Sequence, residues 1–287
     1  EEIIHPMIEE LKVFISSLGR KTIPLLGFGL PGIVDIRRGM VRSNWNRGWN
    51  DVPFADLVGK EIGWPILALN RHRARGLAEC RLGAGREFQE MVYLGISEGI
   101  AAGIYHNRQL MFGIDGGAGE IGHFTILPDG PLCTCGNHGC LQVLANTTAL
   151  EQHARRLLRS GKTSSIYTPG KDDLQLIDAS AILRGAEEGD ELCMEAVENV
   201  AAYIGIAMAN LVNTLNPQAF ILGGSLPRQS PRLVAVAARY MQQRAIDLLS
   251  SHVEVRTATL NDIGGALGAA SFALDQMLDY SLIVGDA

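Results

Sequence analysis

Four residues of types that commonly bind metal ions lie close together in the middle of the chain. His123 is followed by Cys133, Cys135 and Cys140 within a glycine-rich stretch. Three thiolates and one imidazole complete a tetrahedral zinc site, and four protein ligands leave no open position for a catalytic water. The sequence therefore predicts a structural Zn²⁺ ion. His138, within the same stretch, is a competing imidazole.

The alternative is that these cysteines are buried thiols, since free cysteine behaves as a small apolar residue. Their Cys-x-Cys-x4-Cys spacing is dense and lies in a loop, which apolar packing would not require. Glycines in the loop allow the tight backbone turns that would bring the sulfurs together. Cys80 and Cys193 stand alone, so the pattern differs from the disulfide framework of a secreted protein. Metal binding is the preferred interpretation.

Strands alternate with helices around this loop, which predicts an α/β fold with mixed sheets. The expected strands are at 23–29, 66–69, 90–95, 99–105, 220–222 and 253–257, and the expected helices at 52–62, 148–159, 179–189, 191–216, 232–250 and 264–278. Asn70 follows the 66–69 strand directly, at the carboxyl end where sites in α/β folds often lie.

Length and charge limit the classes of function. A chain of 287 residues exceeds the usual size of one domain, so two lobes are expected. The net charge is −6 without a long Lys/Arg run, so this segment alone should bind nucleic acid poorly. No stretch approaches the ~20 apolar residues that cross a bilayer, and the start lacks the features of a secretory signal. We therefore expect a cytoplasmic protein without a membrane partner.

Two motifs resemble the signature of the ROK family, which includes repressors and sugar kinases. Residues 116–123 read GGAGEIGH, and residues 133–141 read CTCGNHGCL. Shorter similar pieces lie at 31–35, 70–79, 216–224 and 265–270. The resemblance covers nearly the whole chain and is strongest to the regulators of the NagC/XylR/Mlc type.

The resemblance implies a two-lobed, actin-like ATPase fold of the sugar kinase type, with a zinc-binding loop. Residues 1–70 and 271–287 would form the smaller lobe. Residues 71–270 would form the larger lobe, with the zinc loop at 113–142.

The resemblance also implies a sugar site. In the family, the glutamate and histidine of Gly-Glu-x-Gly-His contact sugar hydroxyls, which points to Glu120 and His123. Asn70, Gln142 and Gly32 are assigned to the same site. One ring nitrogen of His123 would hold zinc while the other bonds the sugar.

The position of the catalytic base departs from the kinase pattern. Family kinases carry Asn-Asp after the strand that ends here at Leu69, whereas this chain has Asn70-Arg71. A guanidinium stays protonated and cannot accept the proton, and loss of a positioned base removes ~10²–10⁴ in rate. His72 is an alternative base, although its side chain should point elsewhere. Arg71 either clamps an anionic sugar or, in the preferred interpretation, pairs with a nearby acid.

Further departures affect phosphate and sugar. Family kinases show a Gly-Thr-Gly-Ile-Gly-like run where residues 97–103 read SEGIAAG. Glu98 would bring negative charge to the phosphate, at a cost on the order of a few kcal/mol, unless it turns outward. Gln142 replaces a sugar-contacting glutamate, and its amide serves different hydroxyls. The Asp-x-Gly-x-Thr hairpin that begins the kinase fold is not in this sequence.

We therefore expect a kinase-inactive, sugar-sensing effector domain of a ROK transcriptional repressor. By resemblance, a helix-turn-helix segment preceding Glu1 would bind DNA, and the protein would form a homodimer or a dimer of dimers. Two alternatives stay open: an active ATP-dependent kinase for a hexose or amino sugar, and a domain that has lost sugar binding and is regulated by a protein partner.

Overall fold

The chain folds into two compact units. The structure, a computed structural model, describes residues 4–19, 22–44 and 47–284, with side chains as far as Leu278. Unit 1 comprises residues 1–78, 112–118 and 262–287, and unit 2 comprises residues 79–111 and 119–261. The resemblance predicts that the lobes divide at residues 70 and 270. In the structure, the chain passes from one compact unit to the other within helix α3 (Arg71–Leu82) and again at Asp262.

Unit 1 contains two small sheets. Strands β1 (Leu26–Leu30) and β5 (Ile66–Asn70) are parallel, and β2 (Ile33–Asp35), β3 (Met40–Asn44) and β4 (Trp49–Val52) form an antiparallel sheet in that order. The register pairs Leu30 with Asn70, so β1 and β5 end at the same level. Helix α3 begins at the next residue and therefore starts at the carboxyl ends of both strands.

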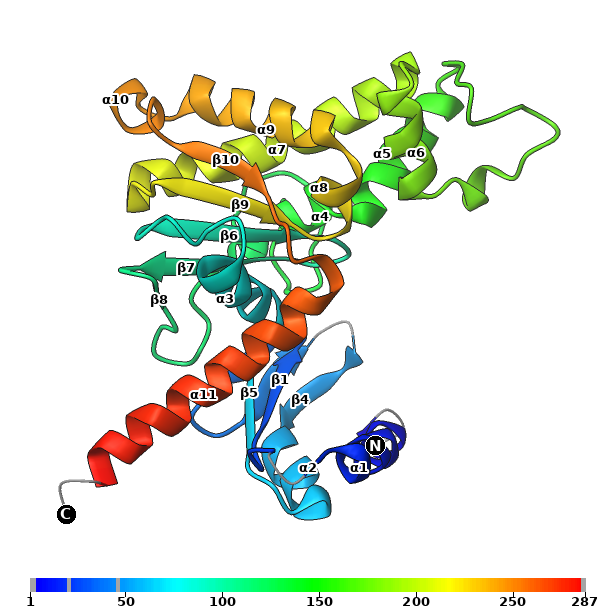
Figure 1. Cartoon of the computed structure of the whole chain (residues 1–287). Helices are drawn as coiled ribbons and strands as arrows, with labels where there is room; N and C mark the ends of the chain where they lie inside the picture. The colour runs from blue at the N-terminus through cyan, green and yellow to red at the C-terminus, as the bar shows by residue number, and fades with distance from the viewer. Residues whose placement is uncertain (1–3, 20–21, 45–46, 285–287) are drawn as a thin grey trace. The chain divides into compact units, whose positions relative to one another are not determined.

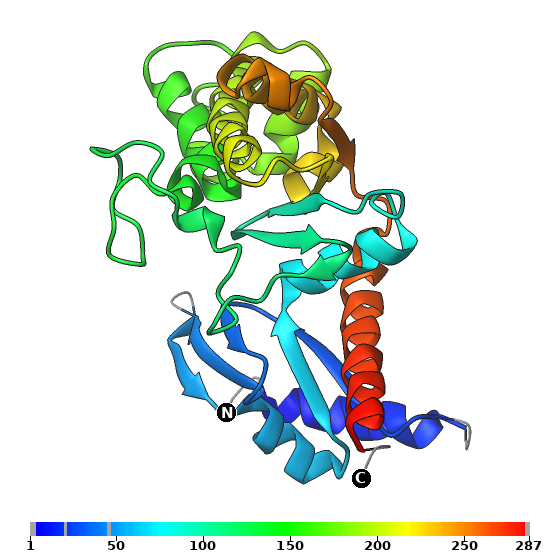
Figure 2. The same cartoon turned by 90° about the vertical axis from the view of Figure 1, so that its left-hand side faces the viewer.

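Three further helices belong to unit 1: α1 (Ile4–Ser17), α2 (Phe54–Ile62) and α11 (Gly264–Val284). Helix α11 runs beside β1 and β5 (Figure 2). The approach is close, because a Cβ atom on Gly27 of β1 would lie 2.1 Å from the carbonyl oxygen of Ala269. Val34, Val41 and Val58 are fully buried in the core of this unit.

Unit 2 is built on one mixed sheet with the strand order β10-β9-β6-β7-β8. Its strands are β6 (Met91–Ile96), β7 (Ile100–His106), β8 (Gln109–Leu110), β9 (Ala219–Gly223) and β10 (Glu254–Thr257). Strand β6 pairs parallel with β9 and antiparallel with β7, and all of its residues are buried. A continuous apolar run is typical of such a central strand.

Helices cover the sheet of unit 2, and α7 and α9 lie side by side along it (Figure 1). The helices described in unit 2 are α4 (Leu141–Ala145), α5 (Thr147–Arg159), α6 (Ala179–Glu187), α7 (Glu191–Leu215), α8 (Ser225–Gln229), α9 (Pro231–Arg244) and α10 (Asp247–Ser250), with 3₁₀ turns at Ile121–His123 and Leu174–Leu176. A further 3₁₀ turn, Asn261–Ile263, lies where the chain passes from unit 2 to unit 1. Helix α7 is long and apolar enough to span a membrane, but Val200, Ile204 and Met208 are fully buried in the unit 2 core. It is therefore a core helix.

Candidate functional site

The four predicted metal ligands lie together in unit 2. The ligand atoms of His123, Cys133, Cys135 and Cys140 all lie within 4.8 Å of one another. The sulfurs of Cys135 and Cys140 are 3.8 Å apart, and Cys133 Sγ lies 3.7 Å from His123 Nδ1. Zn–S bonds of about 2.3 Å in a tetrahedron place neighbouring sulfurs about 3.8 Å apart, so this donor set fits Zn²⁺. The competing imidazole of His138 contacts the Gly130 carbonyl oxygen at 3.1 Å instead.

Tight backbone turns bring these ligands together. Cys133 N–H donates to the Asn137 carbonyl oxygen at 2.7 Å, and Gly136 N–H donates to the Cys133 carbonyl oxygen at 2.9 Å. Gly139 has a φ of +61°, and a Cβ atom there would lie only 1.5 Å from the Leu127 carbonyl oxygen. Only glycine fits at this position, directly before a metal ligand.

Burial favours the uncharged forms of two of the ligands, Cys140 and His123. It raises the pKa of the Cys140 thiol to about 12, and it lowers the pKa of the His123 imidazole. A neutral imidazole is the form that binds metal, and the thiol loses its proton only beside a cation that stabilises the thiolate. The cluster would therefore release protons when it binds Zn²⁺.

Glu120 and His123 lie at the two ends of one 3₁₀ turn. His123 N–H donates to the Glu120 carbonyl oxygen at 3.0 Å. Next to this turn, Ala102 N–H of β7 donates to the Gly119 carbonyl oxygen at 2.7 Å. A Cβ atom on Gly122 would lie 2.2 Å from the Ile100 carbonyl oxygen, so the turn is pressed against the start of β7. The strand thereby fixes the two residues that the resemblance assigns to sugar.

Gln142 holds the turn between β6 and β7. Its Oε1 accepts from Ile100 N–H at 2.8 Å, and its Nε2 donates to the Glu98 carbonyl oxygen at 2.8 Å. Asn146 Nδ2 donates to the same carbonyl oxygen at 3.0 Å, while the Glu98 side chain is exposed. Sequence reasoning missed Asn146, although an Asn-Thr-Thr run before a helix is a recognisable capping signal.

Asn70 and Gly32 come together in unit 1. Asn70 Oδ1 accepts from His72 N–H at 2.9 Å and from Arg73 N–H at 3.3 Å, so it caps helix α3. Its Nδ2 donates to the Gly32 carbonyl oxygen at 2.9 Å. Arg71 is the first residue of α3, and the first turn of that helix contains no acidic residue. The predicted sugar residues thus form two groups, one in each unit.

His72 is buried in α3. The residue is 4% exposed, and neither ring nitrogen has a hydrogen-bond partner among the described residues. Burial, with the nearby charges of Arg71, Arg75 and Arg73, lowers its pKa from 6.5 to about 3. An imidazole in this state is neutral but a very weak base, and it is shielded from solvent.

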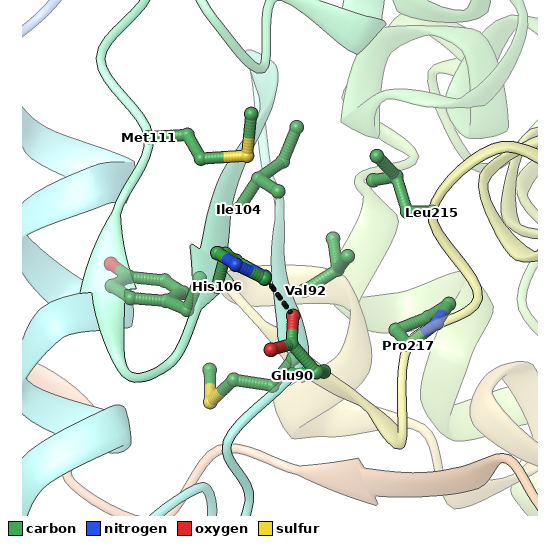
Figure 3. Close-up of a pocket in the computed structure, with 9 residues that line it drawn as sticks. Glu90, Val92, Ile104, His106, Met111, Leu215 and Pro217 are labelled. Carbon is green, nitrogen blue, oxygen red and sulfur yellow. Dashed lines mark hydrogen bonds and ion pairs between the residues drawn. The ribbon is translucent and has the colours of Figure 1, made fainter.

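An apolar pocket of about 240 Å³ lies at the other end of β6 and β7 (Figure 3). Ile104, Met111 and Leu215 contribute to its wall, and His106 Nδ1 pairs with Glu90 Oε2 at 2.9 Å at its edge. None of the residues assigned to sugar or metal lines it. We therefore place the candidate site at the metal cluster and the 3₁₀ turn beside it.

Comparisons with known proteins show that the chain is similar to members of two functional classes, sugar kinases and transcriptional repressors. The sequence profile of the ROK family matches residues 1–276. A glucokinase from Halalkalibacterium halodurans is 30% identical over 244 residues, which cover 85% of this chain and 74% of the enzyme. A putative xylose repressor from Caldicellulosiruptor sp. is 31% identical over 261 residues, which cover 91% of this chain. That match covers 65% of the repressor, less than two thirds of its length.

Solved structures confirm the predicted fold. The crystal structure of a ROK family glucokinase from Streptomyces griseus, in complex with glucose and AMPPNP, superposes with a TM-score of 0.83 and 25% identity. The match covers 94% of this chain and 88% of that enzyme. The predicted α/β fold of the actin-like sugar kinase type is therefore correct. Kinase and repressor relatives are nearly equal in identity, so similarity alone does not separate the two functions.

Proposed function

The chain belongs to the ROK family, and on that premise we propose that it is the sugar-sensing effector domain of a transcriptional repressor, without kinase activity. The observation that carries this proposal is the start of helix α3. By the resemblance, Arg71, the first residue of that helix, takes the place of the aspartate that accepts the proton of the attacking hydroxyl in the family's kinases. A guanidinium cannot accept that proton.

Within the first turn of α3, no described side chain is suited to replace the missing base. The first turn of α3 contains no acidic residue, and the oxygen of the Asn70 amide is used as the helix cap. His72, the alternative base, is buried and has a pKa of about 3. General-base catalysis is efficient when the pKa lies near the working pH, so this imidazole is poorly suited to the task.

The β6–β7 turn also supports a domain that does not use ATP. Phosphate loops bind anions through backbone N–H groups that point at the ligand. Here the Ile100 N–H is already bonded to Gln142 Oε1, and the carboxylate of Glu98 is exposed at the same turn. Both features disfavour a bound phosphate.

In the proposed sensor, Glu120 and His123 of unit 2 contact the sugar, with Gln142 as a further contact, and the resemblance assigns Asn70 and Gly32 of unit 1 to the same ligand. A carboxylate and an imidazole offer an acceptor and a donor to vicinal hydroxyls. Zn²⁺ at the cluster would have a structural role and would orient the His123 ring through Nδ1. Binding would then favour one conformation of the domain over another.

The proposal extends to the whole protein. A DNA-binding helix-turn-helix segment upstream of this domain would let sugar binding control an operator, and a homodimer or a dimer of dimers would match a palindromic site. The repressor relative, of which this chain spans 65%, supports a longer protein of this kind. We propose that it works in the cytoplasm.

A sugar kinase is the second candidate, favoured by the 30% identity to a glucokinase. Sugar-dependent ADP production by the zinc-loaded chain, measured against hexoses and amino sugars, separates the two. We expect no turnover above the sugar-free background. Turnover that His72→Asn abolishes would show an unusual base and overturn the proposal. Turnover that persists in His72→Asn and disappears on further purification would come from a contaminating kinase and would leave it standing.

A further inference from the structure

Gln142 joins three segments of unit 2 that are distant in the sequence. Its amide bonds to the β6–β7 turn at both of its ends, through Ile100 N–H and the Glu98 carbonyl oxygen. A Cβ atom on Gly122 would lie 3.1 Å from Gln142 Oε1, so the amide also packs against the 3₁₀ turn. Both partners of the amide in the turn are backbone groups, so these two hydrogen bonds fix the backbone conformation of the turn.

The metal cluster holds the two other segments. Cys140 is the residue directly before α4, and Gln142 is the second residue of that helix. Leu141 N–H donates to the Phe124 carbonyl oxygen at 2.9 Å, which ties the start of α4 to the residue after His123. A metal ion bound by His123 and Cys140 would therefore clamp the 3₁₀ turn and the start of α4 together, with the Gln142 side chain between them.

The turn is connected onward to other helices. Thr147 N–H at the start of α5 donates to the Ser97 carbonyl oxygen at 3.1 Å. Ser225 N–H, the first of α8, donates to Ser97 Oγ at 2.9 Å. A displacement of the turn would thus disturb the hydrogen bonds at the starts of α5 and α8.

We propose that Gln142 is a positioning residue that couples metal occupancy at His123, Cys133, Cys135 and Cys140 to the conformation of the β6–β7 turn. With metal bound, the amide holds the turn as described; without metal, the start of α4 is released and the turn opens. The inference rests on metal binding at the cluster and is independent of whether the domain senses sugar or phosphorylates it.

The chemistry requires an amide. A glutamate at this position accepts from Ile100 N–H through one oxygen, but its other oxygen faces the Glu98 carbonyl oxygen and cannot donate to it. Gln142→Glu therefore removes one hydrogen bond and adds a repulsion at nearly unchanged volume. Gln152→Glu is the matched control. Gln152 is exposed on α5, and its substitution by glutamate introduces the same change of charge.

The test is amide hydrogen exchange, read by mass spectrometry on the full zinc-loaded chain and after removal of the metal with a chelator. In the wild type, chelation should speed exchange of the 97–103 peptide by at least about tenfold, while peptides from α7 stay protected. Zinc-loaded Gln142→Glu should show that fast exchange already, and Gln152→Glu should match the wild type.

A zinc competition titration completes the test, because coupling between two sites is reciprocal. Gln142→Glu should bind zinc severalfold more weakly than the wild type, and Gln152→Glu should bind it equally well. Unchanged exchange of the 97–103 peptide in Gln142→Glu overturns the proposal. Faster exchange with an unchanged zinc affinity also overturns it, since Gln142 would then hold the turn without coupling it to the metal. If chelation unfolds α7 as well, the zinc-loaded variants still decide the question.

Discussion

At the scale of single residues, His72 is a neutral imidazole in the protein interior, and this makes stability depend on pH. The folded-state pKa is about 3, below the ordinary 6.5 that applies to the unfolded chain. Below pH 6.5 the unfolded state therefore gains a proton that the folded state does not. The free energy of unfolding should fall as the pH drops from 6.5 toward 3, with His72 contributing at most about 1.4 kcal/mol per pH unit.

Chemical denaturation at pH 7 and pH 5 measures this dependence. His72→Asn, which cannot be protonated in this range, should lose less stability over the interval than the wild type does. An identical loss in both proteins would show that His72 is not held neutral by burial. His252→Asn, which removes an exposed histidine, provides the control variant.

The metal ligands make a second prediction at this scale. Cys133→Ser removes one of four zinc donors, and serine is a poor ligand for this ion, so zinc affinity should fall by at least about 100-fold. Zinc content after dialysis, measured by atomic emission, reports the loss. Cys80→Ser is the control, because the Cys80 thiol contacts the Arg108 carbonyl oxygen and takes no part in the cluster. Equal zinc content in the two variants would contradict the assigned ligand set.

Residue type and spacing were enough to predict the metal cluster but not the role of Gln142. Cysteine and histidine carry their chemistry with them, so His123 and Cys133 could be identified without knowing the fold. Gln142 acts through hydrogen bonds to backbone groups more than 40 positions away in the chain, and only tertiary structure brings these together. The burial of His72 was equally hidden, because it depends on what packs around α3.

At the scale of elements, the 3₁₀ turn that carries Glu120 and His123 depends on one close approach. A Cβ atom on Gly122 would lie 2.2 Å from the Ile100 carbonyl oxygen, so Gly122→Ala must push the turn away from β7. We expect a loss of about 1–3 kcal/mol in the free energy of unfolding, together with weaker zinc binding.

Gly117→Ala in the same glycine-rich stretch is the control for this variant. No atom lies within 4 Å of the position its Cβ would take, so it should stay within about 0.5 kcal/mol of the wild type. Denaturant unfolding of the two variants provides the comparison. Equal stability of Gly122→Ala and Gly117→Ala would contradict the packing of this turn on β7.

Most elements were predictable where one face or the whole strand is apolar. Strand β6 and helix α7 follow from their apolar residues, and Pro217 marks the end of α7. Helix α3 was missed, because its arginines break any apolar stripe although most of its residues are buried. The helix expected at 232–250 is interrupted: Ala245 is extended, and Ile246 N–H donates to Asn213 Oδ1 at 3.0 Å instead of continuing the helix.

At the scale of the whole molecule, the resemblance was enough to predict the fold, because the motifs at 116–123 and 133–141 are typical of the ROK family. The exact residues at which the chain passes between compact units depend on packing. The short segment 112–118 joins unit 1 although both of its flanks belong to unit 2. Its Gly116 carbonyl oxygen accepts from the Arg73 guanidinium, a contact that links it to α3. Motif spacing does not encode such a contact.

The central claim is that this domain binds a sugar without needing ATP, and thermal unfolding of the zinc-loaded chain tests it most directly. The panel comprises neutral sugars, amino sugars, sugar acids and sugar phosphates, each with and without ATP and magnesium. A ligand at 100 times its Kd stabilises the folded state by about 2.7 kcal/mol, which raises the midpoint measurably. We predict a rise with one sugar class that ATP and magnesium do not change. A rise that requires ATP would contradict the claim in favour of a kinase, and no rise with any sugar would contradict it in favour of a domain regulated by a protein partner.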